Sequence, residues 1–241
     1  MDVRQWAGDL ADLVLGRACL MCQAPGPSLC GGCLAALRRR GGPSRADLGA
    51  LDPAGSLPLW FALPYRGVGA RLVLAYKEHG HLALRDPLGL LLADAVSGAL
   101  APDGQAACLL PVPSTARSAR GFDALGGIVQ VAAGELVRRG VQTSVARVVR
   151  QVHSHRALKS LDHRARWSAV RGSMRLDPRA ARCLPDARRI VVDDVVTSGA
   201  TTWEAVRVLR AAGVHVAAVA AVAHQEHEAR RAERSSRVGG R

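Results

Sequence analysis

Two adjacent carboxylates, Asp193 and Asp194, directly follow a run of β-branched residues at 190–192. Residues 197–202 then supply hydroxyl groups and a glycine, and a helical pattern begins. This order predicts a buried strand with two acids at its carboxyl end, followed by backbone N–H groups at a helix N-terminus. In an open α/β sheet ligands bind at this edge, and such a loop can hold a phosphate. Because carboxylates accept hydrogen bonds from hydroxyls, we expect the site to suit a 5-phosphorylated ribose.

A simpler interpretation of the same segment is a strand followed by a helix that Thr or Ser caps. A cap needs one polar residue, however, whereas this segment has two acids and a glycine loop as well. The pattern therefore favours a ligand site. Its expected phosphate-binding residues are Val196, Thr197, Ser198, Gly199, Ala200 and Thr201.

Four cysteines near the start of the chain have the spacing of a metal site. Cys19 and Cys22 form one C-x2-C pair, and Cys30 and Cys33 form a second after seven intervening residues. Each pair places two thiolates on the same side of a tight turn, so two facing pairs complete a tetrahedral shell for Zn²⁺. The short spacing predicts a closed, structural zinc site. The alternatives are reduced free thiols or a redox pair.

A second candidate anion site follows an earlier predicted strand at 108–112. The segment 111–123 carries hydroxyls, a glycine and two arginines, and it leads into a helix predicted from about Asp123 to Arg138. The alternative is an ordinary loop between a strand and a helix. Because one phosphorylated substrate could use both loops, we expect this one to contribute to the same site. Its candidate residues are Pro113, Ser114, Arg117 and Arg120.

Taken together, these motifs resemble the ComF family, phosphoribosyltransferase-like proteins linked to DNA uptake in competent bacteria. The resemblance depends on the paired cysteines, on the PVPS and RGFD segments within 111–123, and on VVDDVVTSGATT at 191–202. It extends from about Cys19 to Ala223. One departure is Asp123, where the family usually has Asn.

The resemblance implies a ligand, a cofactor and roles for several residues. The ligand would be phosphoribosyl pyrophosphate bound with Mg²⁺, and Asp193 and Asp194 would be the catalytic residues of a transferase. Lys77 would lie near the pyrophosphate, although a solvated lysine is the alternative. Two hypotheses follow. The first is a phosphoribosyltransferase with an unidentified acceptor. The second is a non-catalytic protein that binds ribose phosphate or nucleotide and acts as an accessory factor for single-stranded DNA or for DNA-uptake proteins.

Strands and helices alternate along the chain, which predicts an α/β fold with a mostly parallel sheet. With the resemblance, the expectation is a phosphoribosyltransferase-type parallel sheet flanked by helices, preceded by a small N-terminal zinc-binding module. A helical pattern at 68–100 is predicted to break near Gly80 and Pro87, and 143–149 is predicted as one strand. The expected divisions are an N-terminal helix and zinc module at 1–45, a linker at 46–58, the phosphoribosyltransferase-like domain at 59–223 and a charged tail at 224–241.

The chain carries a net charge of +13, which predicts attraction to polyanions. Residues 147–175 contain seven arginines and one lysine against a single acid, Asp162. Three interpretations stay open for this basic segment. It could be a loop that closes over substrate, a contact for nucleic-acid backbone with Trp167 stacking on a base, or a solvated loop anchored by Trp167.

Several classes of protein are excluded or disfavoured by the sequence. It has neither a G-x-x-x-x-G-K-[ST] nor a G-x-G-x-x-G motif, which disfavours an ordinary nucleotide-fold ATPase. Its apolar runs are too short for a membrane span, and acids interrupt the N-terminus where a secretory signal would need an apolar core. We therefore expect a cytoplasmic protein. Nothing in the sequence indicates an oligomeric state.

Overall fold

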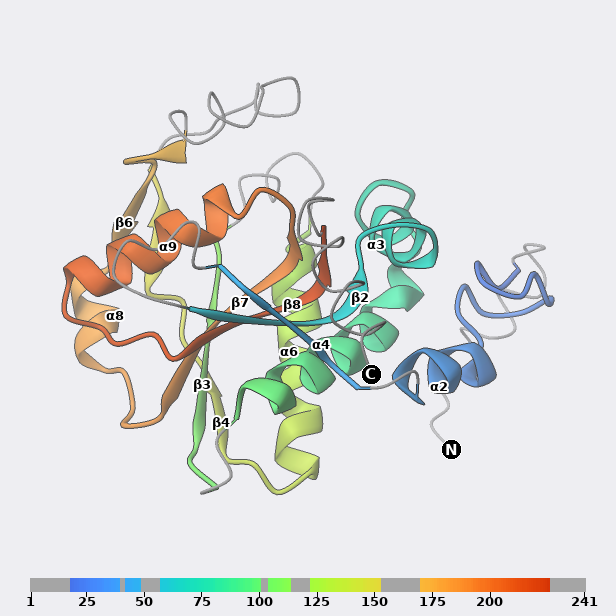
Figure 1. The fold of residues 1–241 in the computed structure, drawn as a ribbon, viewed down its shortest axis with the longest axis horizontal. Coiled ribbons are helices and arrows are strands. Elements are labelled where there is room, and N and C mark those ends of the chain that lie inside the picture. The colour runs from blue at the N-terminus through green and yellow to red at the C-terminus, as the bar shows by residue number, and fades with distance from the viewer. Residues whose placement is uncertain are drawn as a thin grey trace, which may run out of the picture.

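Strands and helices alternate along most of the described chain (Figure 1). The structure is a computed structural model and describes residues 18–39, 42–48, 57–100, 104–113, 122–152 and 170–225. Its strands are β1 (Ser44–Asp47), β2 (Pro58–Pro64), β3 (Ala107–Pro111), β4 (Thr143–Val145), β5 (Val149–Gln151), β6 (Met174–Leu176), β7 (Arg188–Val196) and β8 (Ala218–His224). Its helices are α2 (Gly31–Arg39), α3 (Val68–Glu78), the short 3-10 helix η2 (Leu82–Leu84), α4 (Arg85–Ala99), α6 (Ala124–Arg138), α8 (Pro178–Arg182) and α9 (Ala200–Ala211).

Six of these strands form one mostly parallel sheet in the order β1-β2-β8-β7-β3-β4, which confirms the predicted α/β class. Among its described strands, β1 is the one that runs antiparallel to its neighbour. The other two described strands, β5 and β6, form a separate antiparallel pair. The centre of the sheet is apolar, and all seven residues of β8 are buried. Such a strand must be covered on both faces, as parallel strands usually are.

The direction of the crossovers places helices on both faces of the sheet (Figure 1). The chain moves from β2 to β3 and from β3 to β4 in one direction, whereas it moves from β7 to β8 in the other. Because such crossovers are right-handed, α4 and α6 cover one face and α9 covers the other. Gly89 lets α4 and α6 approach closely, since an added Cβ there would lie 2.4 Å from the Cβ of Val131.

Several predicted boundaries differ from the structure. β7 continues through Val196, so the two acids lie within the strand and not after it; pairing with β8 up to His224 extends it. The predicted strand at 143–149 divides into β4 and β5, which belong to different sheets. The predicted break near Gly80 is confirmed, and this residue has a φ of +71°. The predicted break at Pro87 is wrong, because Pro87 lies in the first turn of α4, where a missing N–H costs no hydrogen bond.

The sheet begins earlier than the predicted domain boundary at residue 59. Ser44–Asp47, which spans the predicted boundary between the zinc module and the linker, forms β1 and pairs with β2. The predicted N-terminal helix, residues 153–169 of the basic segment and the tail from residue 226 lie outside the described residues. None of the helices that the structure describes is long and apolar enough to cross a membrane.

Candidate functional site

The sheet opens where β3 and β7 stop pairing. Their last matched residues are Pro111 and Val192, and the N–H of Val112 still donates to the carbonyl of Val192 at 3.0 Å. Beyond this point β7 is paired with β8 alone, as far as Val196. The chain leaves β3 and β7 in opposite directions, to α6 on one face and α9 on the other. Open α/β sheets bind ligands in the crevice at such a switch point.

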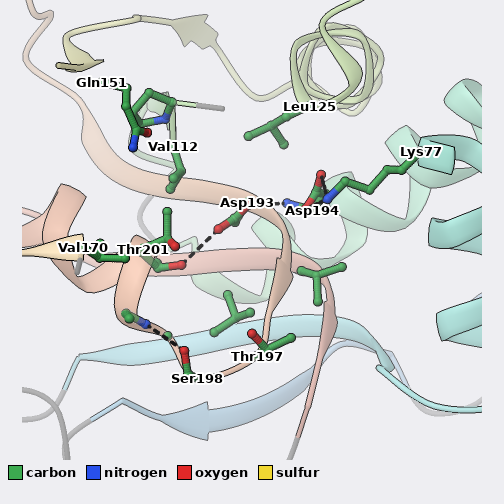
Figure 2. Close-up of a pocket in the computed structure, with 16 residues that line it drawn as sticks. Lys77, Val112, Leu125, Gln151, Val170, Asp193, Asp194, Thr197, Ser198 and Thr201 are labelled. Carbon is green, nitrogen blue, oxygen red and sulfur yellow. Dashed lines mark hydrogen bonds and ion pairs between the residues drawn. The ribbon is translucent and has the colours of Figure 1, made fainter. Parts of the chain in front are cut away.

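A cavity of about 220 Å³ occupies this crevice (Figure 2). Its walls come from α3, α6 and α9, from the ends of β3, β5 and β7, and from Val170. The lining residues are Lys77, Val112, Pro113, Leu125, Gln151, Val170, Asp193, Asp194, Val195, Val196, Thr197, Ser198, Gly199, Ala200, Thr201 and Thr202. The structure therefore gathers both predicted acids, Lys77, Pro113 and the whole predicted phosphate loop around one cavity.

Asp193 and Asp194 point in opposite directions, because successive residues of a strand face opposite sides of the sheet. Asp194 is buried and meets Lys77 of α3, whose Nζ lies 2.8 Å from Oδ1 and 2.7 Å from Oδ2. Asp193 faces α9, where the hydroxyl of Thr202 donates to its Oδ2 at 3.0 Å. The backbone N–H of Asp194 donates to Oδ1 of Asp193 at 2.9 Å. Each acid is thus held by its own set of partners (Figure 2).

The carboxyl of Asp193 titrates near neutral pH. Burial, followed by the negative charge of Asp194, raises its pKa to about 7, while Lys77 and the hydrogen bonds from Thr202 and the Asp194 N–H act in the other direction. A cation or a developing positive charge in the cavity would favour the ionised form. Perturbed carboxyls of this kind in a crevice are typical of functional sites.

The loop after β7 ends in the N-terminus of α9. Gly199 has a φ of +76°, a left-handed conformation that glycine adopts without strain, and it precedes the first helical residue, Ala200. The Oγ of Ser198 accepts a long hydrogen bond from the N–H of Ala200 at 3.5 Å. N–H groups in the first turn of a helix have no intrahelical acceptor, and the helix dipole adds positive potential. This end of the cavity can therefore bind an anion such as a phosphate.

The second predicted anion loop is described only at its two ends. Pro113 lines the cavity, whereas Ser114, Arg117 and Arg120 lie outside the described residues. At its far end Asp123 caps α6 by accepting a hydrogen bond from the N–H of Gly126 at 2.9 Å. Its Oδ2 also lies 2.7 Å from a guanidinium nitrogen of Arg147. An Asn could make the cap but would not offer Arg147 a negative charge.

Six lining residues were not among the predicted site residues: Val112, Leu125, Gln151, Val170, Val195 and Thr202. Leu125 lies in the first turn of α6 and Gln151 ends β5, and neither belongs to a chemical motif. Their place at the cavity depends on how α6 and the β5–β6 pair pack beside β7. No local signal in the sequence carries that information.

The four cysteines at 19–33 form one cluster. Their sulfur atoms all lie within 4.8 Å of one another, and the Sγ atoms of Cys22 and Cys30 are 3.8 Å apart. Four thiolates at about 2.3 Å from a tetrahedral Zn²⁺ would be about 3.8 Å apart, so the observed spacing fits such an ion. These four residues could hold a metal ion.

The electrostatics of the cluster also suit a cation. Burial raises the pKa of the Cys19 thiol, but hydrogen bonds from the backbone of Cys22, Cys30 and Met21 outweigh it and bring this pKa down to about 6. Hydrogen bonding to Cys30, burial and the other cysteines raise the pKa of Cys33 to about 12. Cys19 therefore forms a thiolate readily, and a bound cation would favour loss of the proton from Cys33.

A scan against protein-family models found no match to this chain, and a search of the curated proteins found none. We therefore infer the ligand from the residues of the cavity itself.

Proposed function

We propose that this cavity binds phosphoribosyl pyrophosphate with Mg²⁺, in a phosphoribosyltransferase-type fold of the kind that the ComF resemblance implies. One observation carries the proposal. The acid pair of β7 leads directly into the glycine-containing loop that opens α9, and both lie at the switch point of the sheet. An anion site beside two carboxylates matches the phosphate and the hydroxyls of a phosphorylated ribose.

Each part of the ligand has a corresponding part of the cavity. The N–H groups and hydroxyls of 197–201 would hold the 5-phosphate. Asp193 and Asp194 would lie beside the ribose hydroxyls. Mg²⁺ keeps several water ligands and bridges substrate oxygens, so few protein ligands are needed. Lys77, with Arg117 and Arg120 of the second loop, would balance the charge of the pyrophosphate.

The same residues support transfer of the ribose phosphate to an acceptor. Positive charge develops on the sugar ring as the C1–O bond breaks, as it does in glycoside hydrolysis. An ionised Asp193 near this ring would stabilise that charge without having to move. The cationic groups would stabilise the departing pyrophosphate. The assignment is to the transferase class, within a competence or DNA-uptake context implied by the resemblance.

The test is calorimetric titration with phosphoribosyl pyrophosphate, with and without Mg²⁺. We expect magnesium-dependent binding that the Asp193→Asn/Asp194→Asn double variant loses by at least about tenfold, because two charge-assisted hydrogen bonds are weakened. Asp186→Asn, which changes an exposed acid outside the cavity, is the matched control. Unchanged affinity in the double variant, shown to be folded, would remove the assignment. A pyrophosphate-release assay with a series of nucleobases then tests for transfer.

We also infer that the four-cysteine cluster holds a structural Zn²⁺. The sulfur spacing supports this inference, as does the number of cysteines, because four protein ligands fill a tetrahedral shell. A bound Zn²⁺ would hold the two cysteine turns together in a segment that has little core of its own. Metal analysis of the purified protein tests it directly.

A second candidate function is binding of single-stranded DNA without turnover. It is favoured by Arg150 and Arg175, which lie directly opposite each other on β5 and β6 with both side chains exposed. Like charges in this position repel, and Asp177 pairs with Arg150. A phosphate backbone would relieve the repulsion, and binding would weaken steeply with salt.

This second function is tested by Arg150→Gln/Arg175→Gln against Arg66→Gln/Arg71→Gln, a control pair of exposed arginines near the start of α3. We expect the first pair to reduce the salt dependence of DNA binding by about two phosphate contacts. If both pairs of substitutions reduced the salt dependence equally, DNA would be attracted only to the net charge of the protein and not to a specific site.

A further inference from the structure

A buried serine between the two cysteine pairs contacts the segment that follows α3. The Oγ of Ser28, a residue with 1% of its surface exposed, lies 2.7 Å from Nδ1 of His81. This contact joins residues 53 positions apart. The cysteine module is therefore attached close to the helix that carries Lys77.

The cysteine cluster fixes the position of Ser28. The carbonyl of Ser28 accepts a hydrogen bond from the N–H of Leu20 at 3.0 Å, and Leu20 follows the first cysteine of the cluster. The N–H of Cys30 lies 3.5 Å from the sulfur of Cys19, which links the second pair to the first. Ser28 is thus placed by the way the two pairs close on each other.

His81 in turn fixes the last turn of α3. Gly80 reverses the chain with a φ of +71°, and the N–H of His81 then donates back to the carbonyl of Ala75 at 3.1 Å. Lys77 lies in this turn and reaches Asp194 in the cavity. A continuous series of contacts therefore runs from the cysteine cluster through Ser28, His81 and α3 to the carboxylate of β7.

We propose that Ser28 and His81 are positioning residues through which metal in the cysteine cluster holds Lys77 on Asp194. The four cysteines would hold the metal ion and so keep the two pairs closed. The closed pairs would hold Ser28 against His81, and His81 would order the end of α3. The consequence for the ligand depends on the function proposed above, whereas the effect on α3 does not. Another attachment of the module, from Arg38 to Asp94 at 2.8 and 3.0 Å, joins it to α4.

Thermodynamic linkage gives this coupling a reciprocal form. If metal in the cluster tightens ligand binding in the cavity by some factor, the ligand must tighten metal binding by the same factor. In competition with a chelator at equilibrium, the protein should therefore retain more Zn²⁺ when phosphoribosyl pyrophosphate and Mg²⁺ are present. A module that only packs on the sheet would show no such dependence.

The first experiment measures hydrogen exchange in the full-length, zinc-loaded protein. We expect Ser28→Ala and His81→Ala to speed amide exchange in the last turn of α3 by about fivefold, the factor that corresponds to one hydrogen bond of this kind. His79→Ala, an exposed histidine of the same turn, and Arg38→Ala, at the other attachment, are the controls and should leave this turn unchanged. Exchange equal to wild type in both Ser28→Ala and His81→Ala would overturn the proposal.

The second experiment repeats the hydrogen-exchange measurement after zinc has been removed. Stripping the metal should speed exchange in the same turn, and His81→Ala should then add nothing, because the path is already broken. Additive effects of zinc removal and His81→Ala would contradict a shared path. Because this experiment uses no ligand, it tests the coupling to α3 even if the cavity does not bind phosphoribosyl pyrophosphate.

The ligand arm separates the two proposals. If the wild-type protein binds the ligand, Ser28→Ala should weaken that binding and abolish the gain in Zn²⁺ retention. Ligand binding by the wild-type protein without any gain in Zn²⁺ retention would overturn the coupling alone. If the wild-type protein binds no ligand, the proposed function fails and the exchange results still decide the coupling to α3.

Discussion

Lys77 of α3 reaches the carboxylate of Asp194, 117 residues further along the chain, with its Nζ 2.8 Å from one oxygen and 2.7 Å from the other. The side chains are 23% and 9% exposed, so this ion pair is largely removed from water. A pair in such a place costs desolvation to form, and loss of one partner leaves a buried charge without compensation. The pair therefore connects the stability of the fold to the charge of the cavity.

Lys77→Met should lower the free energy of unfolding by about 2 kcal/mol at pH 8, because it leaves the Asp194 carboxylate buried and unpaired. Methionine keeps most of the apolar part of the lysine side chain, so the loss of stability measures the effect of removing the charge. Denaturant unfolding measures it. The Lys77→Met/Asp194→Asn double variant should recover most of the loss, and a double variant as unstable as the single would show that packing is responsible.

The carboxyl of Asp193 should make the protein less stable as pH rises. Its pKa is about 7 in the folded state, whereas an unfolded aspartate titrates near about 3.9. Between these values the folded protein holds a proton that the unfolded chain has released, so the free energy of unfolding falls with increasing pH. The loss begins near pH 4 and is complete above about pH 7.

Asp193→Asn should therefore raise the melting temperature at pH 8 and leave it unchanged near pH 3. The Asn carbonyl can still accept from the N–H of Asp194, and the Thr202 hydroxyl can accept from the new amide. Thermal unfolding across this range measures the effect. A constant difference between variant and wild type at every pH would contradict the raised pKa. Ligand that needs the ionised carboxyl should bind more tightly as pH rises through about 7.

Substituting alanine at two helical glycines should change the stability of the protein in opposite directions. At Gly89 of α4 an added Cβ would lie 2.4 Å from Val131 of α6, so Gly89→Ala must push the two helices apart. We expect a loss of about 2 kcal/mol. At Gly134, on the exposed side of α6, an added Cβ meets nothing within 4 Å, and Gly134→Ala should stabilise by about 0.5–1 kcal/mol. Denaturant titration of both variants decides whether the close packing of α4 and α6 is responsible for the loss of stability in Gly89→Ala.

The cysteine cluster should hold one metal ion per chain, and Cys22→Ser should weaken that binding and lower the melting temperature, because a ligand is lost from a closed shell. Cys183→Ser, which changes an exposed cysteine outside the cluster, is the control. Metal analysis gives the stoichiometry, and the thiolate-to-metal absorption of a cobalt-substituted sample reports the sulfur ligands. Equal metal content in Cys22→Ser and Cys183→Ser would contradict a four-cysteine site.

The sheet class and the glycine-containing loop between β7 and α9 could be predicted because local patterns determine them. The β-branched run at 190–192 indicates a buried strand, and the residues that follow it bring their own turn and helix start. Long-range packing determines what the sequence analysis missed. β8 extends β7 past the acids, and the partner of Asp194 is a lysine on a distant helix. Strand alternation then separates Asp193 from Asp194, although their adjacency suggests a joint role.

The short strand β1 has a consequence for any attempt to remove the cysteine module. β2 is seven residues long and mostly apolar, and its outer edge is covered by the four residues of β1. Cutting the chain after residue 47 would expose the backbone N–H and C=O groups of that edge to other molecules. Uncovered edges of this kind recruit further strands and lead to aggregation. A truncated protein should thus precipitate for reasons unrelated to metal, and point substitutions are the sounder way to study the module.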